Sequence, residues 1–372
     1  INAQGSLSIA NLRKETDHRL LEHLSGSAAW NGTVLVKNRN ADVRLESNLQ
    51  GIASSLPEPF NKTSTETLPL KFERSAAASS GGTRDQVRIA LGNELAAHLL
   101  RRHDKERTVV ERGVIGIGET PALPEKGVLL AANVPAFNVD FWRGLFAGEG
   151  GKGGGGGHPV SALNLRVGEL IAFDRPFHEV TLKASLQDEA WQGQVASRDV
   201  TGECSWKADG RGRLRARRKQ LTLNDTRPGH ALVAEEPLRE LPGLDVVADN
   251  FVLRGKKLGK LELAASNEGN AWKMEKLALT NPDGALVSDG VWRGGGTQLN
   301  FKLDVSDTGK MLERLGYADA VRRGTAKLEG KVSWAGTPTQ IDHATLDGTL
   351  TAEAARGQFN KLDPGVGRLL GI

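Results

Sequence analysis

The sequence predicts a mainly β fold, in which repeated hairpins form an antiparallel sheet and helices are few and short. Three observations support this prediction. Apolar and polar residues alternate with a period of two in many segments, turn-forming residues separate these segments, and apolar residues at helical spacing are rare. Glycine, at 45 of 372 residues, is well above its usual share of about 7% and indicates many turns.

The alternating segments give each predicted strand one apolar and one polar face. Val43 and Leu45, for example, alternate with charged residues. Such alternation is typical of antiparallel sheets with one face in water, but it is equally compatible with a closed sandwich whose apolar faces pack on each other. The apolar residues that define this face are Val43, Leu45, Val87, Ile89, Leu163, Leu165, Val180, Leu182, Leu261, Leu263, Leu299, Phe301, Leu303 and Val305.

Helical patterns are limited to three short segments. Leucines at helical spacing predict a helix at about 17–24, and an aromatic-rich pattern predicts another at 138–146. Asp307 or Thr308 can cap a third helix that contains Met311 and stops at a glycine. The aromatic helix is expected to plug a core, because its surface is too apolar to be left in water.

Residues 148–158 are expected to form a glycine-rich linker or mobile loop, since eight of them are glycines. This run divides the chain into a β-rich segment, 1–147, which contains the first two predicted helices, and a second β-rich segment, 159–372. The chain begins in mid-pattern and has no terminal signature at its end, so we expect it to be part of a longer protein.

The charge pattern argues against nucleic-acid binding. The net charge is only +4, and basic and acidic residues are mixed along the chain. The strongest basic run, residues 211–219, predicts a strand with one basic face that could meet phosphate, but it has no aromatic residues on which bases could stack. A solvated strand face is the simpler interpretation.

Motifs for catalysis, cofactors and metals are incomplete. The glycines at 113–118 fit a dinucleotide loop until Pro121, and the run at 148–152 lacks the hydroxyl residue of a phosphate loop. A single cysteine, Cys204, allows neither a disulfide nor a cysteine metal cluster, and the pair His98 and His103 is better interpreted as solvated. We therefore expect no enzyme activity, no cofactor and no metal site.

Three tryptophans share a local pattern. Trp30, Trp206 and Trp334 each lie four residues after a glycine, and each is followed by another strand pattern. The pattern indicates hairpins anchored by a tryptophan at comparable positions, although chance matches are the alternative.

The C-terminal part carries the clearest family resemblance. Residues 330–338 (Gly-Lys-Val-Ser-Trp-Ala-Gly-Thr-Pro), the Gly-Gln-Phe of 357–359 and the Asp-Pro-Gly of 363–365, followed by Arg-Leu-Leu-Gly at 368–371, resemble the C-terminal region of YhdP-type proteins of the AsmA superfamily. Residues 139–142 (Val-Asp-Phe-Trp) and 265–272 resemble the same family. Asn360 departs from the family pattern, and the polyglycine run is an insertion.

The resemblance implies a long curved sheet that forms a hydrophobic trough. It also implies a periplasmic location, a parent protein anchored in the inner membrane of a Gram-negative bacterium, and phospholipid transport to the outer membrane that supports the permeability barrier. The implied partners are phospholipid acyl chains and the two membranes, and the apolar residues given above would line the trough.

Two other function classes stay open at this stage. A structural β protein could bind other envelope proteins through its sheet edges without moving lipid. An enzyme acting on envelope glycans would need a carboxylate pair in a cleft, which sequence alone cannot establish.

Overall fold

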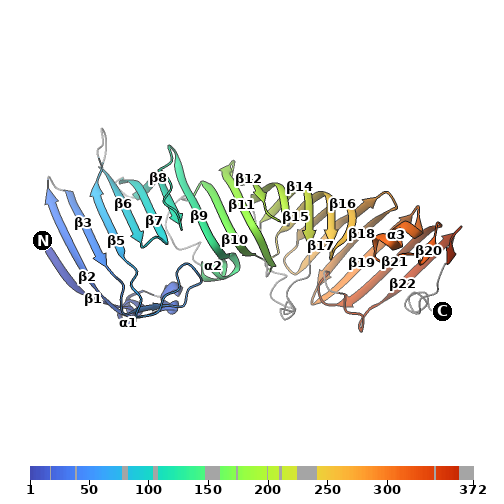
Figure 1. Ribbon diagram of the computed structural model, residues 1–372, viewed down its shortest axis with the longest axis horizontal. Coiled ribbons are helices and arrows are strands. Elements are labelled where there is room, and N and C mark those ends of the chain that lie inside the picture. Colours follow the sequence, from blue (N-terminus) through green and yellow to red (C-terminus); the bar gives the residue numbers. More distant parts are fainter. Residues whose placement is uncertain are drawn as a thin grey trace. The chain divides into compact units, whose positions relative to one another are not determined.

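The protein is mainly β, as the sequence predicts, with only short helices (Figure 1). The computed structural model describes residues 1–16, 18–37, 40–77, 83–103, 108–146, 160–172, 175–198, 200–208, 212–223, 241–338 and 341–359. The chain divides into two compact units. Unit 1 is Ile1–Leu186 with Ala196–Arg198, and unit 2 is Gln187–Val195 with Asp199–Ile372. The expected linker, 148–158, lies outside the described residues.

Unit 1 is a single layer of strands. The ladder runs β1–β2–β3–β5–β6–β7–β8–β9–β10–β11, and β4 pairs with the first residues of β2. The strands are β1 (Asn2–Ser8), β2 (Leu24–Lys37), β3 (Asn40–Ser47), β4 (Ile52–Ser54), β5 (Leu70–Ala76), β6 (Thr83–Leu91), β7 (Leu95–His103), β8 (Thr108–Ile117), β9 (Gly127–Asn138), β10 (Ala162–Ala172) and β11 (Arg175–Gln187).

Unit 2 is built in the same way. Its ladder runs β13–β14–β15–β16–β17–β18–β19–β21–β22, and β20 pairs separately with β23. The strands from the division onward are β12 (Ala190–Ala196), β13 (Val200–Lys207), β14 (Arg213–Leu223), β15 (Gly243–Leu253), β16 (Lys256–Asn267), β17 (Ala271–Asn281), β18 (Gly284–Arg293), β19 (Gly296–Val305), β20 (Val321–Arg322), β21 (Thr325–Ala335), β22 (Asp347–Ala355) and β23 (Gln358–Phe359).

The ladders are mixed rather than antiparallel throughout, which differs from the sequence prediction. The pairs β8–β9, β9–β10 and β14–β15 are parallel. A parallel neighbour requires the chain to return along the sheet before the next strand begins. Residues 118–126 make one such return over β8, so closely that a Cβ on Gly116 would collide with Glu119 and Pro121. The alternation of apolar and polar residues within a strand does not show whether the chain returns along the sheet before the next strand.

The predicted helix at 17–24 is a short 3-10 helix, η1 (Arg19–His23). It ends before Leu24, because Leu24 is the first residue of β2 and pairs with Ser54 of β4. The last leucine of the helical pattern therefore lies in a strand. The α-helix of this region, α1 (Ile9–Glu15), was not predicted; its Ile9 is buried against Ala28 and Ile52.

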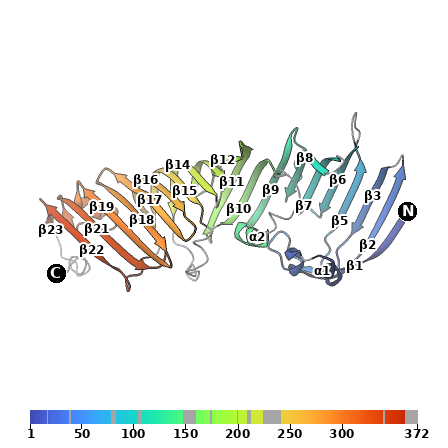
Figure 2. The same cartoon turned by 180° about the vertical axis from the view of Figure 1, so that it is seen from behind.

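The other two helices lie where the sequence places them. The helix α2 (Val139–Phe146) follows β9, and its Trp142 meets Phe60 edge-on and stacks on Phe137. Figures 1 and 2 show α1 and α2 at the same strand ends of unit 1. The helix α3 (Thr308–Arg314) is capped by the Asp307 carboxylate, which accepts a hydrogen bond from the backbone N–H of Lys310. Among the described helices, none combines the length and the apolar run that a membrane crossing takes.

The tryptophans that share the Gly-x-x-x-Trp pattern are not in equivalent environments. Trp334 is buried, whereas Trp30 and Trp206 are half-buried. Trp30 lies against Gly5 of β1, and Trp206 lies against the turn residue Gly212. The anchor prediction therefore holds for Trp334 alone.

Candidate functional site

One face of the unit 1 ladder is apolar from strand to strand. Directly opposed residues in neighbouring strands share a face, so the register identifies its members. We call this surface the unit 1 apolar face. One row across it is Leu45, Phe72, Ile89, Ala97, Ile115, Leu130, Leu163 and Ala184, and the next row is Leu70, Leu91, Leu95, Ile117, Ala132, Leu165 and Leu182.

The predicted residues of unit 1 all lie on this face. Leu45, Ile89, Leu163, Leu165 and Leu182 belong to the two rows above. The remaining three follow from the same registers: Val43 is opposite Arg74, which is opposite Val87, and Val180 is opposite Val167.

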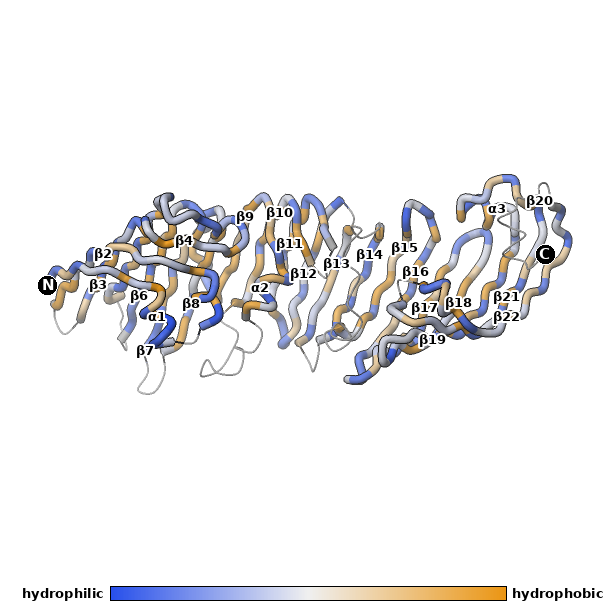
Figure 3. The backbone as a smooth tube through the Cα atoms, turned by 90° about the horizontal axis from the view of Figure 1, so that it is seen from below, coloured by the Kyte–Doolittle hydropathy of each residue, from blue (hydrophilic) through white to orange (hydrophobic). Residues whose placement is uncertain are grey.

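The unit 2 ladder has a corresponding surface, which we call the unit 2 apolar face. It contains all six residues that the sequence assigned to this part of the chain. The backbone tube of Figure 3 changes repeatedly between hydrophobic and hydrophilic colour along the strands of this unit. One row is Ala216, Val246, Leu263, Leu277, Ser288, Phe301, Gly330 and Leu350. The next row is Arg218, Ala248, Leu261, Leu279, Leu286, Leu303, Leu328 and Ala352; Leu299 and Val305 flank these rows on β19.

Both apolar faces are partly open to solvent. Leu45 is 36% exposed and Leu350 is 58% exposed, while Phe301 and Leu303 are half-buried. Val87, Val180, Leu261 and Val305 are buried. Within the described ranges, the strands of each unit belong to one ladder, apart from β20 and β23, which form a separate two-stranded sheet. This arrangement favours an open surface over a sandwich core.

The opposite faces are charged and hydrated. In unit 1, the Nε of Arg44 lies 2.9 Å from the carboxylate of Glu73 in the neighbouring strand. In unit 2, Glu262 lies 2.6 Å from both Lys260 and Lys276. Hydrogen bonds from Lys260 and Lys276 lower the pKa of Glu262 to about 2. These pairs keep one side of each sheet in water.

Buried side chains lie at the two ends of the unit 2 apolar face. At one end, Trp272, Trp292, Thr297 and Trp334 are directly opposed on successive strands, and all four are buried. At the other end, the Met311 side chain of α3 packs against the backbone of Gly284. The face between them is a band that runs across the strands.

A charged cluster lies at one end of the unit 1 apolar face. Asp85 is only 3% exposed, and its carboxylate accepts hydrogen bonds from Arg101 (2.9 and 2.8 Å) and Arg74 (2.6 Å), with the His103 ring 3.0 Å away. Burial acts to raise the pKa of Asp85, but the hydrogen bonds from Arg101, Arg74 and His103 outweigh it and hold the pKa well below its ordinary value.

Replacing Asp85 by asparagine is expected to lower the free energy of unfolding by about 2 kcal/mol, a modest figure because both arginines are partly exposed. Since folding lowers the pKa, the stabilisation is fully present above the ordinary pKa of 3.8 and is lost as the pH falls below it. Urea unfolding at pH 7 and pH 3 checks this. Equal losses at the two pH values would contradict the assignment.

The basic strand predicted at 211–219 is divided between the two faces of the sheet. Arg213, Arg215 and Arg217 lie on the charged face, where Arg217 donates a 2.9 Å hydrogen bond to Asp245. Arg218 lies on the unit 2 apolar face instead. Two consecutive arginines in a strand point to opposite faces, so the sequence contained this signal. Arg211 lies outside the described residues.

Comparison with known proteins gives a consistent result. The model of the YhdP protein family matches residues 1–372, the whole chain. The chain belongs to the YhdP family. A curated relative is the intermembrane phospholipid transporter YhdP of Escherichia coli (strain K12), which is 21% identical over 371 residues, covering 94% of this chain and 29% of the relative. The chain thus spans less than a third of that protein, and no solved structure matches it.

The YhdP family resemblance seen in the sequence is therefore confirmed. It was carried largely by short motifs, and the structure places these motifs on strands, turns and α2. The motif at 330–338 forms the end of β21 and the turn after it, where Trp334 donates a 3.0 Å hydrogen bond to the carbonyl oxygen of Thr337. Residues 360–372, which include the last family motif, lie outside the described residues.

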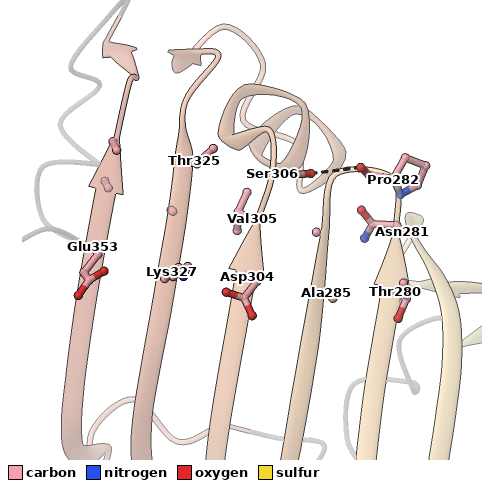
Figure 4. A pocket seen from close by; sticks show the side chains of 14 residues that line it. Thr280, Asn281, Pro282, Ala285, Asp304, Val305, Ser306, Thr325, Lys327 and Glu353 are labelled. Atoms are coloured by element: carbon pink, nitrogen blue, oxygen red, sulfur yellow. Dashed lines mark hydrogen bonds between the residues drawn. The ribbon is translucent and has the colours of Figure 1, made fainter.

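One pocket lies at the strand ends of unit 2 and has a volume of about 790 Å³ (Figure 4). Asp304, Lys327 and Glu353 are directly opposed on β19, β21 and β22 and line it. The two carboxylates are two strands apart, with the lysine between them. This arrangement is a row of alternating charges on the hydrated face rather than a carboxylate dyad.

The described residues offer few other sites. They contain no group of three or more His, Cys, Asp or Glu side chains that could hold a metal ion. His98 hydrogen-bonds Gln86 at 3.1 Å, and His103 belongs to the Asp85 cluster, so the two histidines are not paired with each other. The two apolar faces are therefore the candidate functional site of this YhdP family member.

Proposed function

We propose that this chain binds phospholipid acyl chains on its two apolar faces and guides them between the inner and outer membranes. The observation that carries the proposal is an apolar, half-exposed sheet face in each unit. The name of the Escherichia coli relative, an intermembrane phospholipid transporter, supports the same ligand. The parent protein would lie in the periplasm of a Gram-negative bacterium, anchored in the inner membrane, and would support the outer-membrane permeability barrier.

The energetics explain why an extended face suits this task. Moving a buried acyl chain into water costs about 0.8 kcal/mol per CH₂, so a 16-carbon chain costs roughly 12 kcal/mol. A row of eight strands spaced about 4.8 Å apart extends roughly 34 Å, so a tail can move along it without leaving apolar contact. Such movement needs no catalytic group and no metal, because no covalent bond changes.

A scaffold that binds envelope proteins is the second candidate function, and one observation favours it. All residues of β22 are exposed, and in the described part of the chain β22 pairs only with β21. An exposed edge strand can recruit a partner by adding a strand to the sheet.

Lipid analysis of the purified chain separates these functions. We expect glycerophospholipid to copurify with the 372-residue chain and a fluorescent fatty-acid analogue to bind it and be displaced by phospholipid. Mass spectrometry of an organic extract and a fluorescence titration measure the two. If neither lipid is found on the protein, the transport proposal fails and the scaffold remains.

A further inference from the structure

Arg218 is the exception on the unit 2 apolar face. Its neighbours along the strand on this face are Ala216, which is buried, and Leu221, and the residues opposite it are Gly202 and Ala248. A guanidinium group surrounded by these residues loses hydration, and charged groups in such surroundings normally have a charged partner.

No carboxylate neutralises Arg218 among the described residues. Its Nη1 donates a 3.0 Å hydrogen bond to the carbonyl oxygen of Gly202, and the Cys204 thiol accepts another. A guanidinium has five N–H donors, so most of its hydrogen-bond donors have no partner among the described residues. Burial lowers the pKa of Arg218, which is the direction expected for a cation that lacks an anionic partner.

The cluster on the other unit provides a contrast. Arg74 and Arg101 also lie on an apolar face, but both bind the buried carboxylate of Asp85. The chain therefore neutralises these two cations internally, whereas Arg218 has no carboxylate partner among the described residues. The aliphatic part of the Arg218 side chain lies across Gly202: a Cβ added to Gly202 would be only 3.1 Å from the Cδ of Arg218. This close packing holds the side chain on the apolar face.

We propose that Arg218 binds the headgroup phosphate of a phospholipid whose acyl chains lie on the row from Leu261 to Leu328. This inference rests on the proposed function, because it requires the unit 2 apolar face to hold lipid. A guanidinium suits a phosphate well, since two parallel N–H donors match two phosphate oxygens. The adjoining Leu261, Leu279 and Leu286 supply the apolar surface for the tails.

The test uses the full chain and cross-linking lipids. Phosphatidylglycerol with a diazirine on its headgroup reports where the phosphate end lies, and diacylglycerol of the same chain length with a diazirine on a tail reports tail binding. Cross-linked peptides are mapped by mass spectrometry in the parent, Arg218→Met, Arg218→Lys and Arg217→Gln. Arg217 is the matched control, because it is adjacent but lies on the charged face.

We expect Arg218→Met to lower headgroup cross-links around residues 200–221 about tenfold, equivalent to about 1.4 kcal/mol. Arg218→Lys should keep most of them, and Arg217→Gln all of them. Diacylglycerol cross-links should be unchanged in Arg218→Met, and inorganic phosphate alone should not compete with the lipid. Arg218→Met should melt at or above the parent temperature, because it removes a charge that has no carboxylate partner in the described part of the chain. Replacing a purely structural arginine would instead lower the melting temperature.

The outcomes distinguish a failure of the Arg218 inference from a failure of the lipid-transport proposal on which it rests. If headgroup cross-links map elsewhere, or if Arg218→Met leaves them unchanged while diacylglycerol still binds, the inference is overturned and the transport proposal stands. Equal losses in Arg217→Gln and Arg218→Met would show a general charge effect and also overturn it. If neither lipid cross-links to the parent, both fail.

Discussion

Replacing Trp292 by alanine is expected to lower the free energy of unfolding of unit 2 by about 3–5 kcal/mol, the usual range for a fully buried aromatic residue. Trp292 is 3% exposed and lies directly opposite Trp272 and Thr297. Its cluster also includes Ala265 and Met274. The alanine variant loses the apolar contacts of the indole and leaves a cavity between strands that hydrogen bonds hold at a fixed spacing.

Hydrogen exchange followed by peptide is the suitable measurement, because it assigns the loss to one unit. Peptides of β17, β18 and β19 should exchange faster in Trp292→Ala, whereas peptides of unit 1 should keep their parent rates. Trp292→Phe is the control, since it keeps an aromatic ring in the same place and should lose less. Parent-like protection of β18 in the alanine variant would show that the tryptophan row does not support the sheet.

The face of each strand could be predicted from the sequence because that property is local. A period of two assigns every residue to one side of a strand, and cross-strand registers then preserve the assignment from strand to strand. All fourteen predicted residues accordingly share the apolar face of their own unit. That they line a path for lipid remains a proposal.

The order and direction of strands could not be predicted, because they depend on the paths of the connections. The parallel pairs β8–β9 and β14–β15 show no distinct pattern within the strands themselves. The predicted helix at 17–24 was wrong for a related reason. The spacing of Leu20, Leu21 and Leu24 is helical, but Leu24 belongs to β2, where it pairs with Ser54 of β4.

The charged residues on the apolar faces were missed although the sequence contained a signal for both. Asp85 precedes Val87 and Ile89 with the same period of two, which places it on their face. The consecutive Arg217 and Arg218 cannot both lie on one face. What the sequence could not show is that Asp85 has charged partners on neighbouring strands and that Arg218, among the described residues, has none.

Replacing Leu303 by aspartate is expected to abolish most lipid binding by unit 2 while the sheet stays folded. Leu303 is half-buried, and it lies opposite Leu286 and Leu328 in the middle of the unit 2 apolar face. On an open face the new carboxylate can remain hydrated, so the fold loses little. A sliding acyl chain, in contrast, must displace that water, which raises a barrier of several kcal/mol in its path.

Lys302→Gln is the matched control for Leu303→Asp. It changes the net charge by the same single unit on the adjacent residue, but Lys302 is exposed on the charged face, where its Nζ lies 3.6 Å from Glu329. Tail cross-linking should fall at least tenfold in Leu303→Asp and stay at the parent level in Lys302→Gln, while melting curves of both remain near the parent. If Leu303→Asp unfolds, the carboxylate has been buried in a closed core, because only there does an unpaired charge lose its water. The unit 2 apolar face would then be structural, and lipid would have to bind elsewhere on the chain.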